Sequence, residues 1–563
     1  MKKTQTGNRA KIPLILLLNL LLASLLWTDA LPAGPNPKGP GIQNKISPDL
    51  EEKLNTATGK IRVIIRTRGP ATPGDLADLQ RRGGKILRKF SRFPGVAVEI
   101  SAQAVRGLEH NPRVESISPD RSVRINLDVA APVAWNGALG GNTGGNGLTG
   151  KDVVIAVLDT GIFEHRDLQG EQKSRVLQHV PIALTGKTKP DGNGHGTLVA
   201  GVIGGNGSRS NGPGSFRTFT GVAPGADFIS VQVLSEDGSG YVSDVIGGIE
   251  WVVENKARYK IRIINLSLGH PVQESYKTDP LCQAVEMAWK AGLVVVVSAG
   301  NAGEAGYATI TTPGNDPFVI TVGAMNDLNS ESRLDDVIAS YSSRGPSALD
   351  GVIKPDLVAP GNKIITLGAP NSYLARNYPE LQVPYSAYRK SSGNSNGDNP
   401  SPYFQASGTS LAAPMISGAA ALMLEKDPSL SPNTVKARLM RSAQKIPYDI
   451  VTRGAGYVDI GGALQQTATA RLALSPSVVV DANGQVHFDG TEAVWGDIAI
   501  WGNIAIWGNI TIWGDIAIWG NIAIWGNIAI WGNIAIWGNI AIWGNRDLEG
   551  DIAIWGNIAI WGN

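Results

Sequence analysis

The C-terminal part of the chain is a literal repeat, and its period constrains the fold more than any other feature. Residues 492–563 divide into twelve hexads, most reading Ile-Ala-Ile-Trp-Gly-Asn; the tenth, residues 546–551, has lost its Trp but keeps the phase. An even period keeps each side chain of an extended strand on the same side in every repeat. Three arrangements fit: a β-solenoid with three hexads per coil, an antiparallel meander turning at each Gly-Asn, and an aggregation-prone low-complexity tail. Cell-surface retention, contact with polysaccharide through rows of Trp, and a part in secretion all remain open as roles for this tail.

The opposite end of the chain, residues 1–30, has the three-part layout of a secretory signal peptide. Four basic residues come first: Lys2, Lys3, Arg9 and Lys11. An apolar run at 12–26 and Thr-Asp-Ala at 28–30 follow, and this run is shorter than the ~20 residues that a membrane-spanning helix needs. We therefore expect export with cleavage, and a mature protein that is extracellular or associated with the cell surface and has no transmembrane segment. Residues 31–48, rich in Pro and Gly, predict a linker.

Residues 49–128 carry the pattern of a small α+β domain. Its expected elements are strands at 61–66, 85–90, 96–100 and 113–117, and helices at 75–82 and 102–109. The order β-α-β-β-α-β is that of a ferredoxin-like, split βαβ unit. From residue 31 to 128 there are 17 basic and 10 acidic residues, a net charge of +7. Taken alone, the pattern indicates only a small surface domain of unknown role.

Residues 129–470 have a different sequence pattern, that of a larger α/β domain. Apolar strands at 153–158, 228–234, 261–266 and 294–298 alternate with helical stretches. This alternation predicts a doubly wound parallel sheet, in which ligands bind at the carboxyl ends of the strands. Residues 471–491 are expected to link this domain to the repeats.

Three polar residues stand at element boundaries of the α/β domain. Asp159 follows an apolar strand in Asp-Thr-Gly, where it is either a turn residue or a positioned charge. His195 is flanked by glycines at the start of a helical stretch, which gives its imidazole room to meet another residue, although a solvated histidine fits as well. Ser410 opens the most apolar helix of the chain, either as a simple cap or where free N–H groups favour negative charge.

Taken together, the three residues favour nucleophilic catalysis. A serine hydroxyl is a weak nucleophile unless a base takes its proton, and an imidazole base needs a carboxylate to fix its tautomer. The segments around Asp159, His195 and Ser410 resemble the three signatures of the subtilisin-like serine proteases (subtilases), in the same chain order. Four further segments resemble family landmarks: 221–226, 265–269, 341–346 and 354–361. The resemblance covers roughly residues 130–462 and implies an acyl-enzyme formed on Ser410.

The resemblance also implies residues that bind substrate and the developing oxyanion. Asn301 would be the oxyanion donor, beside the backbone N–H of Ser410. Two edge segments would pair with an extended substrate, and a third would line the pocket: these are Gly238, Ser239 and Gly240; Ser267, Leu268 and Gly269; and Ser298, Ala299 and Gly300. The pocket walls carry no charge, so a broad or apolar side-chain preference is expected.

By the same resemblance, residues 49–128 are a propeptide that inhibits its own protease. Self-cleavage is expected between about Arg121 and Val133. The enzyme region that remains, residues 129–491, has 28 basic and 31 acidic residues. Catalysis requires no cofactor. A structural calcium ion with Asp167 as a ligand remains open, and the metal site is otherwise unknown. The chain has a single cysteine, Cys282, so it cannot have a disulfide scaffold. We expect Cys282 to be a buried packing residue.

The formal net charge of +2 gives no electrostatic reason to expect a nucleic-acid partner. The leading hypothesis is a secreted serine endopeptidase, made as a zymogen, that hydrolyses proteins or peptides. The alternative is a catalytically silent surface or adhesion protein that uses the repeats on a protease-like scaffold. Labelling of Ser410 would separate the two.

Overall fold

The computed structural model describes residues 45–127, 147–183, 190–328, 330, 332–390 and 401–480, and beyond these the backbone of the strands in 486–561. The expected signal peptide and most of the expected linker 31–48 lie outside the described residues. Within the described part, no helix is both long enough and apolar enough to cross a membrane.

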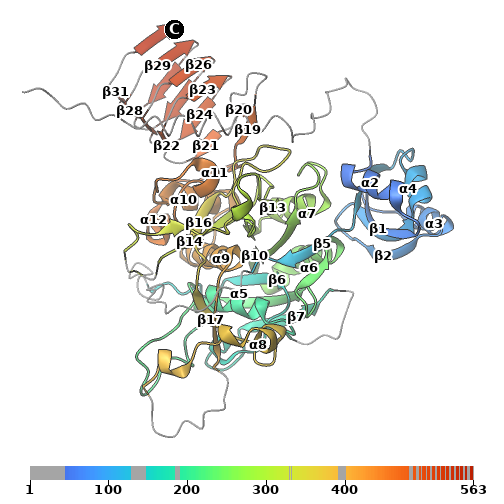
Figure 1. Cartoon of the computed structure of the whole chain (residues 1–563), viewed down its shortest axis with the longest axis horizontal. Coiled ribbons are helices and arrows are strands. Elements are labelled where there is room, and N and C mark those ends of the chain that lie inside the picture. The colour runs from blue at the N-terminus through green and yellow to red at the C-terminus, as the bar shows by residue number, and fades with distance from the viewer. Residues whose placement is uncertain are drawn as a thin grey trace, which may run out of the picture. The chain divides into compact units, whose positions relative to one another are not determined.

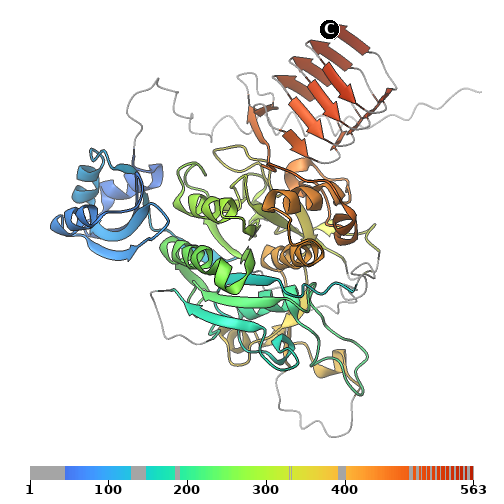
Figure 2. The same ribbon diagram turned by 180° about the vertical axis from the view of Figure 1, so that it is seen from behind.

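The first described domain is a four-stranded antiparallel sheet with three helices (Figure 2). Its elements are α2 (Pro48–Thr56), β1 (Lys60–Thr67), α3 (Pro73–Arg81), β2 (Lys85–Lys89), β3 (Gly95–Ser101), α4 (Ala102–Leu108) and β4 (Val114–Pro119). The strand order is β2-β3-β1-β4. Helix α2 was not expected, and structure begins inside the expected linker, because Ile46 is buried beneath this helix with Leu50.

Both faces of this sheet are buried, because successive side chains of a strand point to opposite sides. Val63 and Ile65 of β1 belong to the domain's own core, shared with its helices. Ile64 of β1 and Ala97 of β3 belong instead to the core of the larger α/β domain. The sheet therefore docks one face onto that domain, and this explains why β1 does not alternate between apolar and polar residues.

The larger domain is built on an eight-stranded sheet (Figure 1). Its strands are β6 (Val154–Asp159), β7 (Val176–Pro181), β8 (Asp227–Gln232), β10 (Ile261–Leu266), β12 (Val294–Ser298), β14 (Ile320–Asn326), β15 (Val337–Ile338) and β16 (Leu357–Pro360). The order is β15-β14-β12-β10-β6-β8-β7, with β16 also beside β14. Every pairing is parallel except that of β15 with β14, so the sheet is a mixed sheet of the predicted α/β class.

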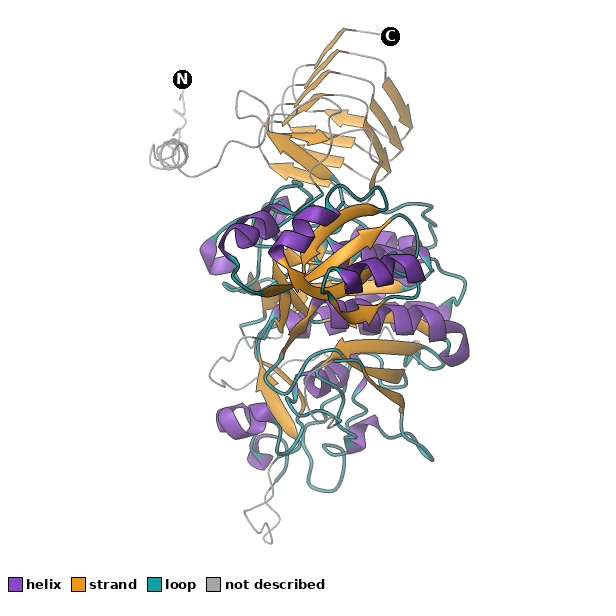
Figure 3. Cartoon of the chain, turned by 90° about the vertical axis from the view of Figure 1, so that its right-hand side faces the viewer, coloured by secondary structure: helices purple, strands orange, loops and turns teal. Residues whose placement is uncertain are grey.

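Helices cover both faces of this sheet (Figure 3). The longer ones are α5 (His195–Gly204), α6 (Val242–Tyr259), α7 (Pro280–Lys290), α9 (Thr409–Lys426) and α10 (Pro432–Ser442), and the shorter ones are α8 (Tyr373–Asn377), α11 (Ile450–Arg453) and α12 (Ile460–Gln465). The chain runs from β7 through α5 to β8, from β8 through α6 to β10 and from β10 through α7 to β12, in the same direction along the sheet each time. Helices α6 and α7 pack against each other. Helix α9 packs against α5 and is buried along nearly its whole length.

A second small sheet joins the two domains. Strand β5 (Ser122–Ile125) follows the first domain and lies between β9 (Ser239–Tyr241) and β11 (Leu268–Pro271), antiparallel to both, and β13 (Thr311–Thr312) completes the sheet. Strands β17 (Ile364–Leu367) and β18 (Tyr403–Ala406) form a separate antiparallel pair. Strand β5 was not predicted from the sequence.

The C-terminal strands pair in a regular pattern. Residues 471–491 are more than a linker, since β19 (Ser477–Val480) and β20 (Val486–Asp489) pair in antiparallel fashion. The repeat strands are β21 (Ala493–Trp495), β22 (Ile498–Trp501), β23 (Ile504–Trp507), β24 (Ile510–Trp513), β25 (Ile516–Trp519), β26 (Ile522–Trp525), β27 (Ile528–Trp531), β28 (Ile534–Trp537), β29 (Ile540–Trp543), β30 (Arg546–Glu549), β31 (Ile552–Ile554) and β32 (Ile558–Trp561). Each strand from β21 to β29 pairs in parallel with the strand three hexads later, as Ile498 does with Ile516. The repeat strands therefore form three parallel sheets and no antiparallel meander.

Candidate active site

Two of the expected catalytic residues are joined by a short hydrogen bond. Asp159 is the last residue of β6 and His195 the first of α5, and both side chains are completely buried. His195 Nδ1 lies 2.7 Å from Asp159 Oδ1, which also accepts the backbone N–H of Thr160 at 2.7 Å. His195 Nε2 has no hydrogen-bond partner among the described residues. The pair is thus arranged as a carboxylate-oriented imidazole with a free ring nitrogen.

Asp191, which the sequence analysis did not single out, ties this pair together. Its carboxylate accepts the N–H of Gly194, the N–H and hydroxyl of Thr197, and the hydroxyl of Thr160. It therefore connects the turn after β6 with the first turn of α5. Burial raises the pKa of Asp191 to about 6. An Asp four residues before a helix-opening His is the sequence signal that could have identified it.

Ser410 is the second residue of α9, and the backbone just before this helix lies close to that of Asn126. Gly408 has φ 148°, and a Cβ there would lie 2.6 Å from the carbonyl oxygen of Asn126, so this position needs glycine. Ser410 Oγ donates to the carbonyl oxygen of Ser267 at 3.0 Å. The structure therefore brings Asp159 and His195 together but directs the Ser410 hydroxyl at Ser267 instead of at the imidazole.

Asn301 and the N-terminus of α9 converge on one carbonyl oxygen. Asn301 Nδ2 donates to the Asn126 carbonyl at 2.8 Å, and the backbone N–H of Ser410 donates to it at 3.3 Å. Asn301 Oδ1 in turn accepts both the N–H and the hydroxyl of Thr409, at 3.0 and 2.8 Å, which fixes the direction of its amide group. Two donors that meet at a carbonyl beside a serine are the arrangement that stabilises an oxyanion.

The two expected edge segments hold the chain itself as an extended strand. Strand β5 pairs Val123 with Gly240 and Arg124 with Ser239 on one side, and Ile125 with Leu268 and Arg124 with Gly269 on the other. The pairing continues at the end of the strand, where Ile125 N–H donates to Gly238 and Asn126 N–H donates to Ser267. All six predicted edge residues thus flank one peptide segment.

The third expected segment follows β12 and lies beside the same asparagine. Ser298 Oγ accepts a hydrogen bond from Asn126 Nδ2 at 2.9 Å. Ala299 is fully buried, and its carbonyl accepts the N–H of Thr311. Gly300 has φ 109°, a left-handed conformation that favours glycine, and its N–H donates to the Thr409 hydroxyl. Asn126 was not singled out from the sequence, which located the expected self-cleavage only between about Arg121 and Val133.

The carboxylate of Asp167 is surrounded by donors of the protein. One oxygen accepts the hydroxyl of Ser208 at 3.0 Å and the backbone N–H of Arg209 at 2.8 Å. The other accepts the hydroxyl of Tyr403 at 2.5 Å. In the part of the chain that the structure describes, no group of three or more His, Cys, Asp or Glu side chains could hold a metal ion. These surroundings do not fit a calcium ion at Asp167, because hydrogen-bond donors occupy the oxygens that would bind it.

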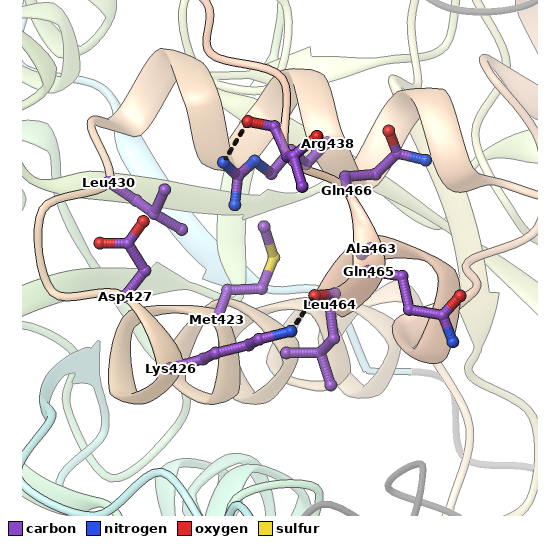
Figure 4. A pocket seen from close by; sticks show the side chains of 10 residues that line it. Met423, Lys426, Asp427, Leu430, Arg438, Ala463, Leu464, Gln465 and Gln466 are labelled. Atoms are coloured by element: carbon purple, nitrogen blue, oxygen red, sulfur yellow. Dashed lines mark hydrogen bonds between the residues drawn. The ribbon is translucent and has the colours of Figure 1, made fainter.

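Two other features lie outside this constellation. A pocket at the C-terminal end of α9 and beside α12 is lined by Lys426, Asp427 and Arg438, among others, but Lys426 and Arg438 already donate to backbone carbonyls (Figure 4). None of the expected site residues lines it. Cys282 is fully buried in α7, and burial raises the pKa of its thiol well above the usual value, as expected of a packing residue.

Comparison with known proteins agrees with this geometry. Residues 150–458 match the model of the subtilase family. The chain is 38% identical to serine protease AprX of Bacillus subtilis over 66% of its own length and 79% of that protein, and 32% identical to an alkaline protease of Alkalihalobacillus alcalophilus over 64% and 77%. The crystal structure of fervidolysin from Fervidobacterium pennivorans, a keratinolytic enzyme related to subtilisin, superposes with a TM-score of 0.55 at 21% identity, covering 76% of this chain and 64% of that one.

Proposed function

The chain belongs to the subtilase family and is a subtilisin-like serine endopeptidase, and we propose that it is a secreted zymogen that cleaves its own Asn126–Leu127 bond. One observation carries the proposal. The carbonyl oxygen of Asn126 receives the two donors expected of an oxyanion site, from Asn301 and Ser410. The bond after this carbonyl is therefore presented to the Ser410 hydroxyl.

The proposed catalytic cycle uses the residues in ordinary roles. The Ser410 hydroxyl leaves the Ser267 carbonyl, gives its proton to His195 Nε2 and attacks the Asn126 carbonyl carbon. Asn301 and the Ser410 N–H hold the resulting oxyanion, and the imidazolium is stabilised by Asp159. His195 then returns the proton to the departing nitrogen of Leu127. Water, activated in the same way, hydrolyses the acyl-enzyme and frees the carboxylate of Asn126.

The first domain acts as the inhibitor in this proposal. Strand β5 fills the cleft between the two substrate-binding edges, so no other peptide can pair there while it stays. Two contacts on α6 support tight docking: Glu250 Oε1 accepts the N–H groups of Arg92 and Phe93 at 2.5 and 2.7 Å, and Asp120 accepts the N–H and hydroxyl of Ser243. Asp120 caps α6 from outside, since the helix's own cap residue, Tyr241, makes no side-chain cap bond.

Secretion and the repeat tail complete the proposal. Export is supported by the basic and apolar layout of residues 1–30. The parallel pairing at a three-hexad interval supports a β-solenoid of four coils for residues 492–563. We propose that it contacts a cell surface or polysaccharide. A chain truncated before residue 492 that loses surface retention without losing peptide hydrolysis would support this role. Catalysis itself requires no cofactor in this mechanism.

The test is to express the whole chain and to sequence the N-terminus of its product. The wild type is expected to yield a fragment that begins at Leu127, and Ser410→Ala is expected to remain uncut. A serine-directed fluorophosphonate should label the wild type after cleavage and leave Ser410→Ala unlabelled. A product that begins at any residue other than Leu127 would refute the proposed site. Absence of both labelling and self-cleavage would favour a catalytically silent adhesion protein.

A further inference from the structure

Asn126 makes a side-chain contact that main-chain pairing does not require. Its Nδ2 lies 2.9 Å from Ser298 Oγ, and Ser298 is fully buried at the end of β12. The walls on either side of the carboxamide, residues 267–269 and 298–300, contain no charged side chain. These walls hold two serine hydroxyls. That of Ser267 donates to the carbonyl of Ser410, so the hydroxyl that bonds the carboxamide is that of Ser298.

We propose that Ser298 is a specificity-determining residue, and that this protease prefers to cut after asparagine. The inference rests on the proposed function, because it takes Asn126 as the residue whose carbonyl is attacked. It narrows the broad or apolar preference that the uncharged pocket walls alone indicate. The Ser298 hydroxyl recognises the carboxamide by a hydrogen bond. The backbones of the two edge segments, 238–240 and 267–269, recognise only an extended main chain.

The physical reason lies in the burial of the hydroxyl. When leucine occupies the pocket, Ser298 Oγ is left buried without the bond that asparagine provides, and an unpaired buried polar group is costly. When aspartate occupies it, a carboxylate is desolvated beside a single hydroxyl and no cation. Asparagine bonds the hydroxyl without carrying charge. A pocket that bonds its substrate in this way discriminates against analogues that lack the group.

Neighbouring positions of the same strand define a suitable probe. Val123 is completely buried in the core of the larger domain, so its position accepts an aliphatic side chain. Ile125 lies against the backbone of Gly238, where a Cβ would come within 3.0 Å of its side chain. A peptide with the sequence Val-Arg-Ile-Asn-Leu therefore reproduces the contacts that the structure shows on both edges.

The test compares peptides Val-Arg-Ile-X-Leu with asparagine, leucine or aspartate at X, using the self-processed full chain. The wild type is expected to give the highest kcat/KM with asparagine. In Ser298→Ala, the ratio of kcat/KM for asparagine over leucine should fall roughly five-fold, which is the worth of one neutral hydrogen bond. The ratio is internal to each preparation, so partial misfolding of the variant does not change it. Ser429→Ala, in an exposed turn, is the matched control and should keep the wild-type ratio.

An unchanged ratio in Ser298→Ala, or a wild type that cuts the leucine peptide as fast as the asparagine peptide, would overturn the inference and leave the proposed function standing. Failure to cut any peptide, together with an uncut precursor, would refute the proposed function and the inference with it.

Discussion

Replacing Arg121 tests the inhibitory contact of the first domain most directly. Arg121 is 7% exposed and forms ion pairs with Asp49 of its own domain at 2.8 Å and with Glu274 and Asp279 of the larger domain at 2.7 and 3.2 Å. Burial raises the pKa values of Glu274 and Asp279, and the charge of Arg121 opposes that rise. In Arg121→Met, the docked state buries both carboxylates without their cation.

The expected loss follows from this burial. Removing one partner of a buried ion pair costs about 3–5 kcal/mol, because the remaining charge is uncompensated. The carboxylates regain water when the cleaved domain leaves, so we expect the lower end, about 3 kcal/mol, or ~100-fold faster release or weaker retention. Both carboxyls have raised pKa values, so they become neutral as the pH falls through those values. The difference between variant and wild type should therefore shrink in acid.

The assay follows retention of the cleaved domain and does not depend on activity. The full chain is allowed to cleave itself and is diluted, and the amount of first domain that still elutes with the enzyme is measured at pH 8 and pH 5.5. Arg92→Met is the control, since Arg92 forms an exposed pair with Glu254 at 3.9 Å, which is worth at most about 1 kcal/mol. A change below five-fold for Arg121→Met, or an equal change at both pH values, would refute the reasoning.

Three further predictions concern the site and its pH dependence. Asn301→Ala should lower kcat about 10²–10³-fold with little effect on KM, and a smaller loss in steady-state kinetics would argue against its oxyanion role. Melting temperatures of the other two variants are measured in a Ser410→Ala background, which prevents self-digestion. Burial raises the pKa of Asp191 to about 6, so the folded chain binds more protons than the unfolded chain between pH 4 and 6, and Asp191→Asn should be less destabilised at pH 7 than at pH 4. Burial lowers the pKa of His270 to about 4, so the parent should gain stability from pH 4 to 6.5, and His270→Gln should lack that gain; parallel curves would contradict it.

Four strands of the larger sheet, β6, β8, β10 and β12, were predictable because each is a mostly apolar run between turns. Strands β10 and β12 have the bounds that the sequence predicts, and every residue of the two strands except Arg262 is buried. Strand β5 escaped prediction because its four residues, Ser-Val-Arg-Ile, resemble any short extended segment. Its partners β9 and β11 lie more than 100 residues away, and no local signal reports such pairing.

The site residues also fall into two groups, those that local sequence marks and those that depend on the folded chain. Asp159 and His195 were recognisable because a strand end and a ring of glycines mark them locally. The role proposed for Asn126 depends on the register of β5 between two edges, which only the folded chain sets. The hydrogen bond from Ser410 to Ser267 is likewise a property of the conformation, because a serine hydroxyl changes its direction by rotation about one side-chain bond.

The pairing of the repeat strands also has a consequence for how the tail can change in length. Each hexad forms one of three equivalent sides, so inserting or deleting a single hexad moves every later strand to the next side, where it meets the same sequence. The charged strand β30 is the exception, because its sequence, Arg-Asp-Leu-Glu, differs from that of the strand it pairs with. Replication slippage at such a repeat would therefore lengthen or shorten the tail in steps of about a third of the ~4.8 Å spacing between strands, without losing the register of the ladder.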